Sequence, residues 1–304
     1  MAIMTATIAE AQAVQAMYDQ QQIAWQRQVD LLNTTQASLR TELAACKGQL
    51  PTVPPVYPSG FAPQKANQAS TTVPKIWKNI WFEDFVTPVA EGGFSLAYPT
   101  FNAYGKGWPD TNHNTAKAQY QGFDNISVSD NRMKVRLYTP QGSYARVAAL
   151  GPNNDARLIG MRCAMAFRVV NAIGGYHLIP ILTWPGDEQW PLHGEIDFTE
   201  NDSRANDRLN LFTHRANAAG GVDGVPAGIT MPLLGESVWH LLEFEMIPGV
   251  SATYWVDGRL IVKHTTQIPS TSHRWVMQLE GTTGSNVTGQ SIVEVDWASQ
   301  WSLV

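Results

Sequence analysis

The first fifty residues show the apolar repeat of a long helix. Residues 5 to about 48 contain no Pro, and no Gly precedes Gly48. Two interleaved rows have the spacing of a coiled-coil seam: Trp25, Leu32, Leu39 and Cys46, and Val29, Gln36, Leu43 and Leu50. We predict a helical segment over residues 1–50 that forms a parallel coiled coil through residues 5–48 and joins several copies of the chain, a homotrimer being favoured. The alternative is a helix that packs on its own domain or is partly disordered.

The next segment, residues 51–75, has a different character. It reads PTVPPVYPSGFAPQKANQASTTVPK and contains six prolines. Proline removes a backbone donor and favours extended chain, so this composition predicts a linker and not a folded element. The linker would space the helical segment from whatever follows.

From residue 76 onward, short stretches of alternating apolar and polar residues are separated by turn residues. The predicted strands are 126–138, 143–150, 158–170, 176–184, 194–200, 208–214, 239–247, 252–264, 273–281 and 291–303. Asp257-Gly258 marks the tip of a hairpin inside one of them. So many strands without a convincing helix predict an all-β domain over residues 76–304, a two-sheet sandwich of the jelly-roll kind.

Composition narrows the classes of function. Apolar residues make up 44% of the 304 and charged residues 15%, with a formal net charge of −5, so a basic nucleic-acid surface is not expected. No apolar run is long enough to cross a membrane, and the N-terminus lacks the features of a Sec signal. Cys46 and Cys163 fall in different predicted segments, so we expect free thiols. The eleven Trp residues serve either a large β core or sugar stacking.

One predicted strand, in HGEIDFTEND (193–202), is unusually acidic. Alternate residues of a strand share a face, so Glu195 and Asp197 point one way while Ile196 and Phe198 enter the core. Glu200 is out of phase by one residue. A β-bulge near Phe198 would return it to the acidic face.

Three carboxyl groups on one face repel one another. Such crowding raises the pKa of one carboxyl group and leaves its neighbour ionised, which supplies a general acid and a nucleophile for a glycosidase. From spacing alone two other interpretations stay open, a calcium site built from alternating oxygen ligands and a solvated acidic face.

The acidic strand and its surroundings resemble glycoside hydrolase family 16, the group of laminarinases, lichenases, agarases and carrageenases. EIDFTE has the family's Glu-Xaa-Asp-Xaa-Xaa-Glu pattern, and WPLHG stands before it as Trp-Pro-gap-Gly does in the family. VWHLLEFEM, TYWVDGRLI and the terminal VEVDWASQWS follow in the family's order, and WFEDF resembles its first strand. The resemblance extends over about residues 78–303.

This resemblance implies a concanavalin-like β-jelly roll with a concave sugar-binding groove and retaining, endo-acting hydrolysis of a β-linked polysaccharide. It implies that Glu195 is the nucleophile, Glu200 the acid/base and Asp197 the assisting acid. Trp190 would line the subsite beside the nucleophile, and His214 would face the same groove from a neighbouring strand. No cofactor is expected, and a structural calcium ion is left open.

Further substrate contacts are weaker expectations. Trp184 stands near the end of its strand, where it can replace a ring that family members carry earlier in that strand. Gln278 shares a strand face with Glu280, and that face either lines the groove or is solvated. Trp108 lies in a loop and is a candidate for stacking on a sugar. His177 is expected to be a packed or rim residue.

A coiled coil, a Pro-rich spacer and a carbohydrate domain together resemble a bacteriophage tail or fibre protein. This hypothesis places the chain in a virion, or outside the cell without a visible Sec signal. Two rival functions remain: a lectin-like domain that binds a glycan without cleaving it, and a purely structural virion decoration. The crowded acids argue against the first, and the Trp-rich groove argues weakly against the second.

Overall fold

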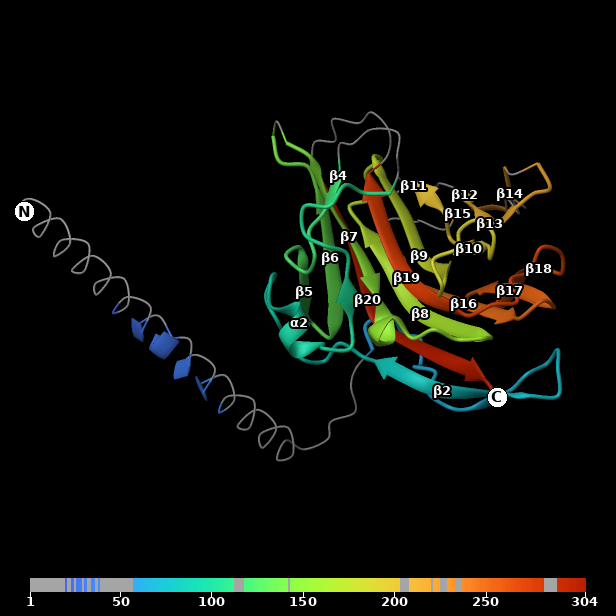
Figure 1. Cartoon of the computed structure of the whole chain (residues 1–304), viewed down its shortest axis with the longest axis horizontal. Coiled ribbons are helices and arrows are strands. Elements are labelled where there is room, and N and C mark those ends of the chain that lie inside the picture. Colours follow the sequence, from blue (N-terminus) through green and yellow to red (C-terminus); the bar gives the residue numbers. More distant parts are fainter. Residues whose placement is uncertain are drawn as a thin grey trace, which may run out of the picture. The chain divides into compact units, whose positions relative to one another are not determined.

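The computed structural model describes scattered residues between 20 and 38 and most of the chain from residue 57 onward. Within the latter part, the description omits 112–117, 142, 203–207, 220, 225–228, 233–236 and 282–288. The chain divides into two compact units, Met1–Pro54 and Pro55–Val304. The second unit is the β domain (Figure 1).

In the first unit, the described residues between 20 and 38 are all helical and exposed. Gln26 donates a hydrogen bond to Asp30 one turn later, at 2.9 Å. The predicted seam positions from Trp25 to Leu50 lie outside the described residues. The coiled coil and the oligomer therefore stay predictions. In the part of the chain that the structure describes, no helix is long and apolar enough to cross a membrane.

The β domain is a jelly-roll sandwich, as predicted. Its first sheet contains β1 (Gln68–Ala69), β2 (Ile76–Glu83), β4 (Ala118–Tyr120), β5 (Ile126–Ser129), β6 (Arg132–Tyr138), β8 (Met161–Val170), β16 (His240–Ile247), β17 (Ser251–Val256), β18 (Arg259–His264) and β20 (Gln290–Leu303). Strand β20 is central: β8 pairs along one edge of it, and β6 and β2 pair one after the other along the opposite edge.

The second sheet carries the acidic strand. It contains β3 (Asn102–Ala103), β7 (Ala145–Gly151), β9 (Tyr176–Pro185), β10 (Glu195–Phe198), β11 (Asn201–Asp202), β13 (Leu211–Ala216), β14 (Val222–Gly224) and β19 (His273–Gly281). Strand β7 also pairs with β4 and β6 of the first sheet, so it joins the two. A separate small ladder and two short helical turns complete the domain: β12 (Arg208–Leu209), β15 (Ile229–Pro232), α2 (Phe94–Ala97) and a 3-10 turn at Pro152–Asp155.

Every strand predicted from alternation is present, but the predicted strands 126–138 and 208–214 are each divided into two, β5 and β6 and β12 and β13. The hairpin at Asp257-Gly258 is confirmed, and both residues have the positive φ that its tight turn requires. The predicted strand 126–138 is instead a hairpin of β5 and β6, because Asp130 and Asn131 also adopt positive φ. Asp and Asn tolerate this conformation better than other non-glycine residues, so a second tight turn forms there.

The main core lies between the sheets and follows the predicted alternation. In β6, Met133, Val135 and Leu137 are fully buried, whereas the intervening residues of this strand keep part of their surface accessible. On β19, Trp275 is fully buried and its indole N–H donates to the Pro180 carbonyl at 3.0 Å. A buried indole N–H needs such a partner.

A second apolar cluster covers the opposite face of the first sheet and changes the predicted domain boundary. Trp77, Trp297 and Trp301 are fully buried there, and Tyr57 and Phe61 pack against the cluster. The Trp297 indole donates to the Phe61 carbonyl at 3.0 Å, and the Trp301 indole donates to the Ala66 carbonyl at 2.9 Å.

The prediction that residues 51–75 form a free linker is therefore wrong from residue 57 onward. Ser59 donates its backbone N–H to Asp296 at 2.8 Å, and β1 pairs with β2. We call residues 57–66 the strap. Its prolines prevent helix formation but leave carbonyl groups free to accept from the tryptophans of β20, so the composition suits a packed extended segment as well as a linker.

Candidate active site

Four neighbouring strands of the second sheet position the acidic residues. Strand β10 lies between β9 and β13, and β9 pairs on its other edge with β19. Glu195 is opposite His214 in the β10–β13 ladder, and Gln278 of β19 is opposite Ile179 of β9. Residues far apart in the sequence therefore face the same side of one sheet.

That side of the sheet is hollowed into a cavity of about 640 Å³. The cavity is lined by Tyr104, Thr111, His177, Ile179, Trp184, Glu188, Trp190, Glu195, Asp197, Glu200, His214, Arg274, Gln278 and Glu280. Of the eight candidate site residues predicted from the sequence, the structure brings together seven. Glu195 and Asp197 are buried at its floor, whereas Glu200 is partly exposed.

Glu200 reaches the shared face at an irregularity between β10 and β11. Against β9, these strands keep one register before and after Thr199 and Glu200. Against the β13 side, Phe198 is opposite Leu211, and the next backbone hydrogen bond runs from the Glu200 N–H to the Asn210 carbonyl at 2.9 Å, so the pairing shifts by one residue at Thr199 as the predicted bulge requires. A cis peptide bond joins Phe198 to Thr199. The predicted position of Glu200 beside Glu195 and Asp197 is found.

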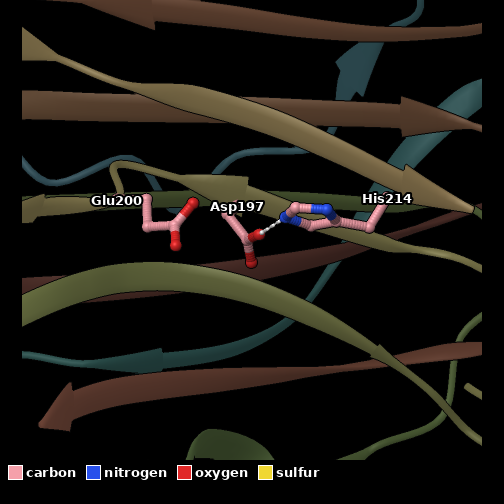
Figure 2. Close-up of side chains that lie close together, drawn as sticks. All are labelled: Asp197, Glu200 and His214. Carbon is pink, nitrogen blue, oxygen red and sulfur yellow. Dashed lines mark ion pairs between the residues drawn. The ribbon is translucent and has the colours of Figure 1, made fainter. Parts of the chain in front are cut away.

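Asp197 is the central member of the acidic group. Figure 2 shows the Asp197 carboxylate between the carboxylate of Glu200 and the ring of His214. The Asp197 Oδ2 atom lies 3.0 Å from His214 Nε2. The His214 ring is stacked on Phe212, with ring centroids 5.4 Å apart and planes 10° apart. Phe212 thus fixes the orientation in which His214 meets Asp197.

Burial dominates the electrostatics of the cavity floor. It raises the pKa of Glu195 well above its ordinary value, and the charges of Asp197 and Glu200 add to this rise, while His214 and a hydrogen bond from Trp190 oppose it. Burial also raises the pKa of Asp197, and Glu200 adds to it. The sequence argument expected crowding to be the main cause, whereas loss of solvent is the larger one.

Trp184 and Trp190 form an aromatic wall beside Glu195. Their rings are parallel within 9°, with centroids 6.1 Å apart. The Trp184 indole N–H donates to Glu188 at 2.7 Å, and Trp190 keeps 43% of its surface exposed. Glu188 also pairs with Arg274. An exposed, held aromatic face next to carboxylates is the arrangement that binds the apolar face of a sugar ring.

Near Glu200, the cavity is polar. Gln278 and Glu280 line it from β19, and His177 lines it from β9. Of the two alternatives left open by the sequence, the face shared by Gln278 and Glu280 is the one that lines the cavity. His177 was expected to be packed or at the rim, but its ring lies in the cavity with Nε2 3.5 Å from Glu200 Oε1. In the sequence, His177 stands between the apolar residues Tyr176 and Leu178, which are buried. This alternation indicates that the His177 side chain faces away from the core.

Trp108 is the candidate that the structure does not bring to the site. It is 61% exposed and does not line the cavity. Its ring instead lies over Gly105, which closes the same turn through a backbone hydrogen bond from Trp108. Thr111 of the same loop does reach the cavity, so the loop was correctly placed but the wrong residue was chosen.

One group of described residues has the donor atoms of a metal site. Asp197, Glu200 and His214 each offer a ligand atom, and these atoms lie within 4.8 Å of one another. Calcium prefers six to eight oxygen ligands, so two carboxylates and an imidazole do not match the calcium ion left open by the sequence. The absence of a cofactor and the structural calcium ion stay predictions.

The fold of the β domain is similar to that of several solved structures. No family model matches the sequence, and no curated protein matches it. The laminarinase from Rhodothermus marinus superposes with a TM-score of 0.59 and 16% identity, over 76% of this chain and 99% of that one. LamAcat from Zobellia galactanivorans gives 0.58 and 18%, over 74% and 97%.

The non-specific endo-beta-1,3(4)-glucanase SCLam, from family GH16, gives a TM-score of 0.57 with 15% identity, over 78% of this chain and 94% of that one. The chain has the family 16 glycoside hydrolase fold. At these identities the similarity is one of fold. The family 16 resemblance stated from EIDFTE and its flanking motifs agrees with it.

Proposed function

We propose that the chain is a retaining, endo-acting glycoside hydrolase of a β-linked polysaccharide. One observation carries the proposal: Glu195, Asp197 and Glu200 line one cavity together with the aromatic pair Trp184 and Trp190. A surface that only solubilised the protein would not bury two of these carboxyl groups. A general acid and a nucleophile beside a sugar-binding wall are what glycoside hydrolysis needs.

In this mechanism Glu195 attacks the anomeric carbon while Glu200 protonates the leaving oxygen, so a covalent glycosyl-enzyme forms. Glu200, now ionised, then takes a proton from water, which attacks the anomeric carbon and releases Glu195. Asp197 lies beside Glu195, which opposes the effect of burial on the pKa of Asp197, and its Oδ2 atom lies 3.0 Å from His214 Nε2. It is suited to orient the nucleophile and to adjust its proton affinity.

For the substrate we favour a β-glucan with 1,3 linkages. A variant of the Zobellia protein was crystallised with laminaritriose and laminaritetraose. Another structure with this fold, at a TM-score of 0.59, comes from work on endo-acting O-glycanases that initiate mucin breakdown. The substrate panel should therefore contain laminarin, mixed-linkage glucan, agar-type galactan and mucin glycans.

The test is release of reducing ends from that panel by the full chain and by Glu195→Gln. The variant keeps an acceptor for Trp190 but removes the nucleophile, so we expect loss of nearly all product. Proton NMR of the first products tests stereochemistry, and retention of the β-anomer is the expected result. A product that first appears as the α-anomer contradicts the retaining mechanism.

The second candidate is a lectin-like domain that binds glycan without cleaving it. The nearly parallel rings of partly buried Trp184 and exposed Trp190 favour carbohydrate binding whether or not hydrolysis follows. Binding to one glycan of the panel with no reducing ends from wild-type protein would support this candidate. The two buried, crowded carboxyl groups are the reason to prefer the enzyme.

We further propose that residues 5–48 join the chain into a homo-oligomer, with a trimer favoured, in a phage tail or another extracellular assembly. The helical residues described between 20 and 38 and the seven-residue repeat of the seam support it. Light scattering on the full chain tests it, and a monomer at micromolar concentration contradicts it. Immunogold labelling of virions tests the location.

A further inference from the structure

His177 lies between two carboxylates of the cavity. Its Nε2 atom is 3.5 Å from Glu200 Oε1, and its Nδ1 atom is 3.7 Å from Glu280 Oε2. The β9–β19 register places His177 directly opposite Glu280, so this contact is set by the sheet itself. Both distances are those of ion pairs and slightly exceed hydrogen-bond length, as is common in substrate-free sites.

Glu280 is held in place from its other side. Its Oε1 atom accepts from the Tyr120 hydroxyl at 2.7 Å and from the Thr111 backbone N–H at 3.0 Å, and the Thr111 hydroxyl also donates to it. Oε2 is thereby left for His177. Burial alone would raise the pKa of Glu280, but the contact with His177 and the hydrogen bonds from Thr111 and Tyr120 outweigh it and keep this pKa below its ordinary value.

The ionised, anchored carboxylate of Glu280 determines the orientation of the His177 ring. This carboxylate favours a proton on Nδ1 and favours the charged ring, which directs Nε2 toward Glu200. The titratable groups facing His177 among the described residues are Glu280 from β19, Glu200 after β10, and Tyr120 from β4 beyond Glu280. The β9–β11 ladder also places Asp202 opposite His177. The cavity's arginine, Arg274, contacts Glu188 and Asp155 instead.

We propose that His177 is a positioning residue for Glu200, the acid/base of the proposed function, on which this inference rests. The His177 ring holds Oε1 of Glu200, so the other oxygen is free to give its proton to the leaving group and later to take one from water. Anchored Glu280 keeps the ring oriented.

The kinetic test measures kcat and KM on soluble glucan across pH for the full chain. We expect His177→Ala to lower kcat by about 10²-fold, the effect of displacing a catalytic group by about 1 Å, with a much smaller change in KM. We expect His177→Gln to recover part of this loss, because its amide still contacts Glu200.

Glu280→Gln should lower kcat by less than His177→Ala does, because it weakens the anchor of the His177 ring without removing the ring. Gln278→Ala is the matched control. It lies on the same strand and in the same cavity, so it should change KM and leave kcat nearly unchanged. Folded His177 variants with wild-type kcat would overturn the proposal.

A measurement without turnover separates this inference from the proposed function. The imidazole nitrogens of His177 can be titrated by NMR in the full chain and in Glu280→Gln. We expect the His177 midpoint to fall in the variant, because the ring loses an opposite charge. An unchanged midpoint sinks the proposal, whereas inactivity of the wild-type chain with a shifted midpoint sinks only the proposed hydrolase.

Discussion

At the scale of single residues, the site places ionisable groups where water is scarce. Glu195 is 9% exposed and Asp197 only 2%, yet both belong to the proposed chemistry. Burial disfavours the charged form of a carboxyl group, and like charges in contact increase the effect. Burying these carboxyl groups therefore costs stability at the site of the proposed chemistry, which is the usual relation between stability and activity in enzymes.

Replacing Glu195 by Gln should therefore stabilise the fold while abolishing hydrolysis. The folded pKa of Glu195 is raised, so its contribution to stability is fully present below its unfolded pKa and is lost as pH rises through the folded pKa. The variant should melt higher than wild type at pH 8, by about 2–4 °C per kcal/mol gained, and nearly equal to it near pH 4. Calorimetry at both pH values checks this.

Glu188→Gln is the control for that prediction. Glu188 also lines the cavity, but it is paired with Arg157, Arg274 and Trp184, so its replacement should not raise the melting temperature. A stabilisation of the Glu195 variant that is the same at both pH values would show that charge is not the cause.

The sequence predicted the residues of the site better than their partners. Glu195, Asp197 and Glu200 follow from one acidic strand, because alternation within a strand is local. His177 and Glu280 meet across two strands separated by about a hundred residues, and only the register brings them together. Trp108 failed for a related reason: loop geometry, and not residue type, decides which aromatic ring reaches a cavity.

At the scale of elements, the strap shows how a β-sheet with two apolar faces is completed. Trp297 and Trp301 share one face of β20, because they are four residues apart. That face is the one away from the main core. Each indole needs an acceptor as well as cover, and the strap supplies both through the Phe61 side chain and the carbonyls of Phe61 and Ala66. The strap is therefore part of the fold.

Removing the strap should destabilise the β domain strongly. A chain that starts at residue 68 uncovers Trp77, Trp297 and Trp301, each worth about 1.5–3 kcal/mol when buried. We expect aggregation on expression, or a melting temperature lower by at least about 8 °C. A chain that starts at residue 55 keeps the strap and serves as the control. Equal melting of the two chains would contradict the assigned role.

The sequence alone could not identify the strap, because six prolines predict extended backbone whether or not it packs. The apolar side chains of Tyr57 and Phe61 were too few to produce a periodic signal. The outward tryptophans of β20 were the better indicator, since a fully exposed pair of Trp residues on a sheet is unusual. The local pattern of apolar and polar residues thus predicts strands reliably. It misses a segment such as the strap, which is ordered only by its contacts with the surface that it covers.

At the scale of the whole molecule, the chain consists of a first unit, whose described residues are helical, and a β domain with its own core. The boundary at Pro54–Pro55 separates units that are each compact by themselves. Every described residue that lines the proposed active site belongs to the second unit. The proposed oligomer would therefore act by presenting several copies of the β domain together.

This separation predicts that the helical unit affects binding to surfaces and leaves turnover of small substrates unchanged. The full chain and a chain that starts at residue 55 should have the same kcat/KM on soluble oligosaccharides. On insoluble polysaccharide an oligomer gains effective concentration, so the full chain should bind about 10²-fold or more tightly than the shorter one. Depletion assays on washed glucan measure the difference. Diluting the full chain until light scattering shows monomers should remove the gain, and a gain that survives in monomers would mean that residues 1–54 contact the polysaccharide themselves.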